Sequence, residues 1–234
     1  RVARGYRISW EFPGDVGQPT EISLRAPPGF RVGPARFPAP ERVELPGGLV
    51  AYAYRGDTAV FFEVTPPRSM GADDVHRLDM SGAWVACKRS CVAERTQAFL
   101  ELMTTTVDAP AEEARAELAP LLARVPDEQP GALELRWEVD GVEATLVATT
   151  PGARPRDFFP DGKATPPPLG VTFGEDALRF RFAEAPRPGS RPLRGVVVVS
   201  GPGGERALRL VAPLPGEDAP GTVAPDPRGR ATPR

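Results

Sequence analysis

The chain has 234 residues, a mass of 25.1 kDa and a formal charge of −2 at pH 7, from 29 basic and 31 acidic side chains. A pI near 5.7 excludes the strongly basic surface that nucleic-acid binding requires, so we expect no nucleic-acid partner. No apolar run approaches the ~20 residues that cross a bilayer, so we expect a soluble chain without direct membrane insertion by these residues. The start at Arg1 without a methionine suggests an omitted signal peptide or upstream region.

The N-terminal part of the chain predicts an antiparallel β-sandwich. Apolar and polar residues alternate over residues 6–12, the period of a strand with one buried face, and Pro13-Gly14-Asp15 ends the run. The 30 prolines and 24 glycines of the chain bound further short strands. We expect these strands at 20–24, 43–45, 49–54, 58–64, 75–80 and 96–103.

One segment has a helical pattern instead. Asp108 can cap a helix that opens at Pro110, and apolar residues then follow one stripe up to Val125, before Pro126. The stripe is formed by Ala114, Leu118, Leu121, Leu122 and Val125. We therefore predict a connecting helix over residues 110–125.

The C-terminal part predicts a second, smaller β-sandwich. A hairpin is expected from 133–139 and 142–148 around an Asp140-Gly141 turn, and Gly201 to Gly204 is interpreted as a second hairpin turn. Further strands are expected at 177–182, 194–200 and 206–211. After Pro213 the chain has little to bury, which predicts an extended Pro/Gly-rich tail or linker.

These patterns divide the chain into four parts. We expect two immunoglobulin-like antiparallel β-sandwiches joined by a short helix, and therefore an all-β fold. The first sandwich covers residues 1–107 and the helix 108–128. The second sandwich covers 129–213 and the tail 214–234.

Few side chains are available for catalysis: the chain has one histidine, two cysteines and no Gly-rich phosphate-binding loop. A Ser-His-Asp triad would need His76, but no nucleophile elbow is present, and we interpret His76 as a surface residue. A zinc site would need Cys87, Cys91, His76 and a carboxylate, and the Cys-x3-Cys spacing is wider than in a usual zinc knuckle. We therefore expect no metal and no bound cofactor.

The most informative segment is WVACKRSC at 84–91, where an apolar strand runs into two cysteines. Their side chains can form a disulfide if residues 88–90 make a tight turn or bulge. A disulfide that closes so short a loop adds little to the stability of the folded chain. Redox exchange therefore explains the spacing of the cysteines better than stabilisation does. Lys88 and Arg89 would favour the thiolate that attacks and leaves in exchange. A structural disulfide or two idle thiols remain the alternatives.

Motifs along most of residues 5–213 occur in the order of one known family. They are ISWEFPGDVG at 8–17, PPGF at 27–30, FPAPER at 37–42, LPG at 45–47, Tyr52-x-Tyr54-x-Gly56, residues 84–94, FFP at 158–160 and LRGV at 193–196. Together they resemble the periplasmic N-terminal region of the thiol:disulfide interchange protein DsbD family, in particular its ScsB-like branch. The resemblance implies an immunoglobulin-like fold, in agreement with the strand pattern.

The resemblance also implies a redox role. It identifies Cys87 and Cys91 as the redox-active pair, with Cys91 making mixed disulfides and Cys87 resolving them. Electrons would arrive from a membrane-embedded electron-transfer domain, in the same chain or a separate one, and pass to periplasmic thioredoxin-like proteins, for example in cytochrome c biogenesis. The implied location is periplasmic, with a tether to the inner membrane. The resemblance further implies a cap loop at 49–56 that shields the cysteines, with Tyr52 and Tyr54 as the candidate shielding residues. Tyrosines two positions apart also fit an ordinary packed strand face.

The chain departs from the family after the second cysteine. Relatives usually have a hydrophobic residue, Pro and then Gly or Glu, whereas this chain reads Val92-Ala93-Glu94-Arg95. Ala93 frees the backbone φ and restores a hydrogen-bond donor, so the geometry and potential of the pair are expected to differ from those of relatives.

A second function from another class fits the same patterns. Two immunoglobulin-like domains could form a non-catalytic cell-envelope binding module that holds a partner through sheet edges or loops. In that case the disulfide would only fix a turn.

Overall fold

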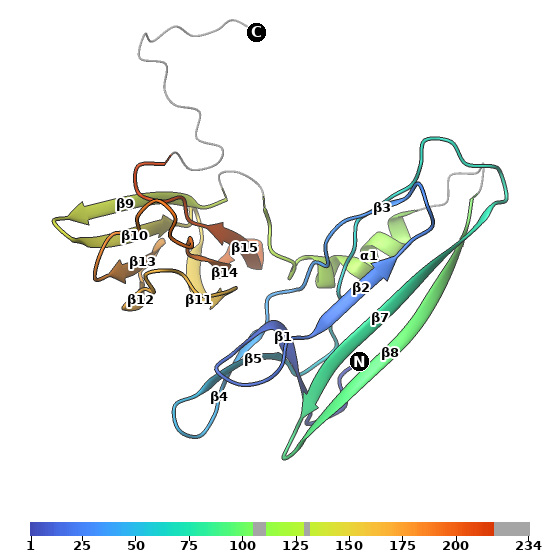
Figure 1. The fold of residues 1–234 in the computed structure, drawn as a ribbon, viewed down its shortest axis with the longest axis horizontal. Coiled ribbons are helices and arrows are strands. Elements are labelled where there is room, and N and C mark those ends of the chain that lie inside the picture. Colours follow the sequence, from blue (N-terminus) through green and yellow to red (C-terminus); the bar gives the residue numbers. More distant parts are fainter. Residues whose placement is uncertain (105–110, 129–131, 218–234) are drawn as a thin grey trace, which may run out of the picture.

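The computed structural model describes residues 1–104, 111–128 and 132–217, and it is built almost wholly from β-strands (Figure 1). Every ladder between its named strands is antiparallel. The predicted all-β fold class is confirmed. Asp108, Pro110 and the tail beyond residue 217 lie outside the described residues.

The N-terminal half is organised around a six-stranded sheet in the order β2-β7-β1-β5-β4, with β8 paired to β7. A two-stranded ribbon, β3-β6, accompanies it. The sheet strands are β1 (Arg7–Gly14), β2 (Glu21–Arg25), β4 (Glu41–Glu44), β5 (Val50–Tyr54), β7 (Val75–Cys87) and β8 (Cys91–Met103), and the ribbon strands are β3 (Arg31–Val32) and β6 (Val64–Thr65).

β7 and β8 form a hairpin of two 13-residue strands, longer than the predicted runs at 75–80 and 96–103. On its other edge β7 changes partner: it pairs with β2 from Asp79 to Ala83 and with β1 at Ala86 and Cys87. Each part of β7 therefore meets a different neighbour, which explains why no single alternating pattern runs along the whole strand.

The prediction of a strand over 58–64 is wrong. Phe61 makes one isolated bridge with Arg36, and regular pairing begins only at Val64 in β6. The preceding strand, β5, is already paired on both edges with β1 and β4, so it offers no free edge to this segment. The alternating apolar pattern of residues 58–64 instead reflects side-chain packing, because Val60 lies against a buried cluster.

The connecting helix is α1 (Ala111–Leu122), within the predicted range of 110–125. Its predicted apolar stripe is not buried throughout, since Leu118 and Leu122 are exposed. Val125, beyond the helix end, is buried, and the Ala39 backbone N–H donates a hydrogen bond to the carbonyl of Arg124. The segment after the helix therefore attaches to the N-terminal half through its backbone.

The C-terminal half is a sandwich of a four-stranded sheet, β12-β13-β10-β9, and a three-stranded sheet, β11-β14-β15. One buried cluster draws side chains from both sheets, including Leu146, Phe180, Val197 and Leu210. The strands are β9 (Glu134–Asp140), β10 (Glu143–Thr149), β11 (Arg154–Pro160), β12 (Gly170–Phe173), β13 (Ala177–Phe182), β14 (Arg194–Gly201) and β15 (Gly204–Val211).

Both predicted hairpins of this half are present. The first turns at Gly141-Val142, one residue later than predicted, with Gly141 at φ 61° as a tight turn of this kind requires. In the second, Gly201 pairs with Gly204. β11 was not predicted, because Pro155 and Pro160 make it read as a loop.

The three-stranded sheet is buried on both faces. Phe158 points into the sandwich core, while the next residue, Phe159, joins a second buried cluster with Trp10 and Tyr52 of the N-terminal half. The ring of Phe159 lies 5.2 Å from that of Tyr52 and 6.2 Å from that of Trp10, centroid to centroid, both edge-on. Two-sided burial explains the continuous apolar run of β14, Val196 to Val199.

A salt bridge reinforces this junction. Arg42 Nη2 donates to Oδ1 of Asp157 at 2.6 Å and to the carbonyl of Phe158 at 2.9 Å. The guanidinium also lies over the rings of Tyr52 and Phe159, with its Cζ 5.4 and 5.7 Å from their centroids. Because the pair is only partly exposed and forked, it fixes the relative position of the two halves better than a surface pair would.

Glu11 is a half-buried carboxyl at the same junction. Burial raises its pKa to about 7, with Asp161 adding to the shift and Arg209 opposing it. Asp161 itself accepts a hydrogen bond from Arg209 Nη1 at 2.8 Å. Glu11 is therefore expected to lose its proton near neutral pH rather than in the acidic range that is usual for a carboxyl group.

Truncating Phe159 tests how much the junction stabilises the chain. We expect Phe159→Ala to lower the free energy of unfolding by about 3–5 kcal/mol, because it opens a cavity between two aromatic neighbours. Phe173→Ala, at an exposed position of β12, is the matched control and should change it by less than about 1 kcal/mol. Chemical denaturation measures both, and equal effects would contradict the described junction.

Candidate redox site

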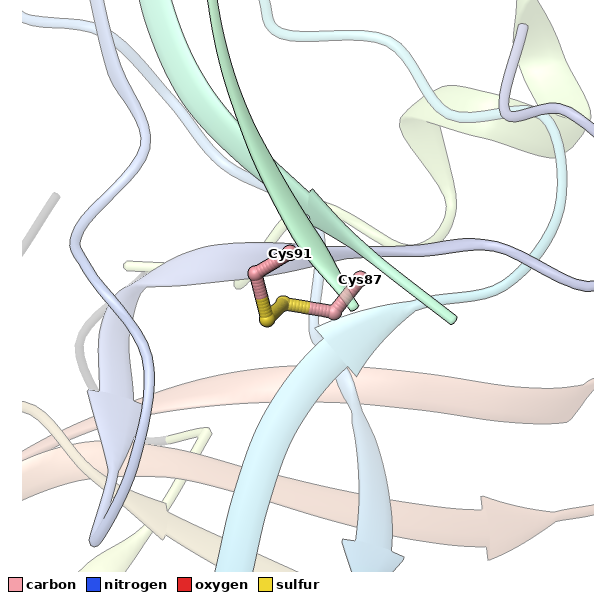
Figure 2. Close-up of a disulfide and its surroundings, with 2 residues drawn as sticks. All are labelled: Cys87 and Cys91. Carbon is pink, nitrogen blue, oxygen red and sulfur yellow. A yellow bond between two sulfur atoms is a disulfide. The ribbon is translucent and has the colours of Figure 1, made fainter. Parts of the chain in front are cut away.

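Cys87 and Cys91 form a disulfide across the tip of the β7-β8 hairpin (Figure 2). The S–S distance is 2.03 Å, and the Cα atoms of this cross-strand pair are 4.1 Å apart. The three intervening residues make the tight turn that the spacing requires, closed by a hydrogen bond from the Lys88 N–H to the Ser90 carbonyl at 3.0 Å. The site therefore consists of two sulfurs held by a short turn, and the chemistry that these sulfurs offer is thiol–disulfide exchange.

The two cysteines have different surroundings. Cys87 is 8% exposed, because β7 is flanked there by β8 on one edge and by β1 on the other, where Arg7 is its register partner. Cys91 is exposed, because it begins β8, whose only partner strand in the described part of the chain is β7. An attacking sulfur can therefore reach Cys91 more easily than Cys87.

The N-terminal segment lies against the turn. The Lys88 ammonium is 5.7 Å from the centroid of the Tyr6 ring, and the space beside Gly5 is filled by the end of the Lys88 side chain. Arg89 is exposed in the turn. Sequence analysis missed Tyr6, Gly5 and Arg7, because only the pairing of β1 with β7 brings them to cysteines about 80 positions away.

The two tyrosines nominated as shielding residues lie in the core of the N-terminal half. Tyr52 packs against Trp10 and Phe159 and beneath Arg42. Tyr54 is 2% exposed and donates a hydrogen bond from its hydroxyl to the Pro38 carbonyl at 2.7 Å. Burial raises the pKa of Tyr54 well above its usual value, which keeps it a neutral donor. The shielding role of Tyr52 and Tyr54 stays a prediction.

A cavity of about 490 Å³ lies beside the hairpin, on the sheet face opposite the disulfide rung. Ala86 and Val92, the rung next to the cysteines, line it together with Tyr6, Tyr54 and Trp84. The Trp84 indole N–H donates to the Glu94 carboxylate at 3.0 Å and so fixes one wall. A largely apolar cavity, rather than closely packed core side chains, therefore lies behind the hairpin tip.

His76 lies away from the cysteines, near the opposite end of β7. It is half-buried rather than a surface residue, with its ring 5.0 Å from that of Phe30. The structure therefore does not bring His76 to the disulfide. Among the residues that the structure describes, no group of three or more His, Cys, Asp or Glu side chains is arranged to hold a metal ion, and no helix is long and apolar enough to cross a membrane.

Comparisons with known proteins agree with this architecture. No family model matches the sequence, and no curated protein matches it either. A solved structure does: the N-terminal periplasmic domain of ScsB from Proteus mirabilis matches with a TM-score of 0.54 over 92% of this chain and 85% of that chain, at 17% sequence identity. The chain has a ScsB-like fold. The resemblance drawn from the sequence motifs is thus supported at the level of the fold.

Alkylation rates test directly whether the two cysteines differ in their exposure to solvent. In single-cysteine variants, we expect the thiol of Cys87→Ser, which retains Cys91, to be alkylated about tenfold faster than that of Cys91→Ser, because Cys91 is exposed. Iodoacetamide labelling followed by mass spectrometry measures both rates, and in denaturant they should converge. Equal rates in the folded chain would contradict the asymmetry.

Proposed function

We propose that the chain is an extracytoplasmic thiol:disulfide interchange domain, a protein-disulfide reductase that works as one part of a larger relay. It passes reducing equivalents to periplasmic thioredoxin-like proteins through the reversible Cys87–Cys91 disulfide. One observation carries the proposal: the disulfide lies at a hairpin tip, with one cysteine buried between strands and the other exposed.

The proposed reaction has two halves. A dithiol from a membrane electron-transfer domain, in the same chain or a separate one, attacks the disulfide, and its second thiolate resolves the intermediate. Cys87 and Cys91 gain two electrons, and the donor leaves as a disulfide. We propose that the domain works in the periplasm and is tethered to the inner membrane.

In the second half the electrons leave the domain. The Cys91 thiolate attacks one sulfur of the partner's disulfide, which expels the partner's other sulfur as a thiolate and forms a mixed disulfide. The Cys87 thiolate then attacks Cys91, which restores the Cys87–Cys91 bond and releases the partner as a dithiol. The exposure of Cys91 supports its role as the attacking sulfur, and the burial of Cys87 supports its role in resolution.

Lys88 and Arg89 support the same chemistry by charge. Both cations lie in the turn between the cysteines, where a positive charge stabilises a thiolate relative to a thiol. The contact with Tyr6 keeps the Lys88 ammonium at the hairpin tip. We propose that these cations favour the reduced, reactive form of the pair.

Cysteine variants test the assignment of roles. We expect Cys91→Ser to reduce electron transfer to an oxidised thioredoxin-like protein to background, and Cys87→Ser to accumulate a mixed disulfide, because its resolving thiolate is absent. Non-reducing electrophoresis and thiol counting measure both effects. Ser90→Ala, which alters the same turn without removing a thiol, is the control and should transfer normally. Normal transfer by Cys91→Ser would contradict the assignment.

A further inference from the structure

Among the residues that the structure describes, β8 is an outer edge strand that pairs with β7 on one side and has no partner strand on the other (Figure 1). All of its 13 residues are exposed except Thr96, which is half-buried. Natural edge strands are commonly blunted by proline, by charged side chains, lysine above all, or by a bulge, and β8 does carry Glu94, Arg95 and Glu101. β8 contains neither proline nor lysine, and its pairing with β7 runs from Cys91 to Met103 without a bulge. It is therefore a long, regular edge that another strand can extend.

Apolar side chains are exposed along this edge. Five of them have exposed fractions between 42% and 66%: Val92, Phe99, Leu100, Leu102 and Met103. They lie on both faces of the strand, since successive side chains alternate. Exposed apolar side chains gathered on one edge strand are typical of an interaction surface rather than of a solvated edge.

We propose that β8 pairs with β8 of a second copy of this chain, so that two six-stranded sheets join into one continuous antiparallel sheet. Each copy contributes the same strand, so the contact is self-complementary and closes at a dimer. This inference does not depend on the proposed redox function.

The charges on β8 select the register. A two-fold axis perpendicular to the sheet places one residue of β8 opposite its own copy. With Ala98 at the axis, Arg95 of each copy lies opposite Glu101 of the other, which forms two identical ion pairs across the strands. If the axis moves by one residue, Arg95 faces Phe99 or Met103 instead, and both charges lose their partners.

Both charges are available for this pairing. Arg95 and Glu101 are exposed, and neither makes an ion pair with another residue in the described part of the chain. The neighbour of Glu101 on β7 is Arg77, which is engaged elsewhere: its Nε lies 2.8 Å from Asp79 Oδ1, and its Cζ lies 4.1 Å from the Phe99 ring centroid. Glu101 is therefore left to the second copy.

The same register suits the apolar side chains. The small side chain of Ala98 faces its own copy at the axis, which allows the strands to approach closely. Leu100 then lies opposite Thr96, and Phe99 opposite Gln97, so that each large apolar side chain meets a smaller or polar neighbour. The overlap extends from residue 93 to residue 103 and leaves Cys91 outside the paired segment, accessible to a redox partner.

Charge reversal tests the proposal with the full chain. Sedimentation equilibrium should show a dimer, and Glu101→Arg should raise its dissociation constant at least about tenfold, because it sets two pairs of arginines opposite each other. The double variant Arg95→Glu/Glu101→Arg should restore the original value. Glu143→Arg, at an exposed position of β10, is the control. A chain that stays monomeric at high concentration, or a dimer indifferent to Glu101→Arg, would overturn the proposal and leave β8 to a strand of another protein.

Cross-linking tests the position of the axis independently. In a Cys87→Ser/Cys91→Ser background, Ala98→Cys should form a covalent dimer on mild oxidation, because the two thiols face each other across the axis. Thr96→Cys, on the same face but opposite Leu100, should not. Cross-linking at both positions or at neither would overturn the proposed register.

Discussion

The pairing of β1 with the last two residues of β7 is the constraint on which the rest of the site depends. It encloses Cys87 between two strands, while Cys91, one turn later, begins an edge strand that has one neighbouring strand among residues 1–104, 111–128 and 132–217. The same pairing brings Tyr6 against Lys88 and so holds a cation at the hairpin tip. Two cysteines separated by only three residues thus acquire the different exposures that exchange chemistry can use.

The C-terminal half stabilises the N-terminal half through a contact that does not include the disulfide. Its three-stranded sheet is covered by its own sandwich on one face and by the N-terminal half on the other, with Phe159 between Trp10 and Tyr52. The forked, hydrogen-bonded ion pair of Arg42 and Asp157 stabilises the same contact between the two halves. The second half therefore stabilises the N-terminal sheet on one face. The hairpin tip and the β8 edge are not covered by any strand that the structure describes.

Local sequence patterns predicted the parts of the fold that depend on neighbouring residues. β13 matches its predicted range, and the Cys87–Cys91 bond is one of the outcomes that the spacing of the cysteines allowed. The rest depends on contacts between distant segments: nothing near Tyr6 indicates that it meets Lys88. β11 was not predicted because of its prolines, although its two phenylalanines, Phe158 and Phe159, pack into buried clusters on opposite faces of the sheet. Tyr52 and Tyr54 were nominated by resemblance, and only the structure locates them in the core.

The reduction potential of the Cys87–Cys91 pair tests the central claim most directly. The purified chain would be equilibrated in graded thiol/disulfide buffers, and its alkylated thiols counted. The account predicts a potential between roughly −180 and −270 mV, the range of dithiols that exchange with protein partners. A potential below about −300 mV, or a bond that no reductant opens in the folded chain, would contradict it and identify the disulfide as structural.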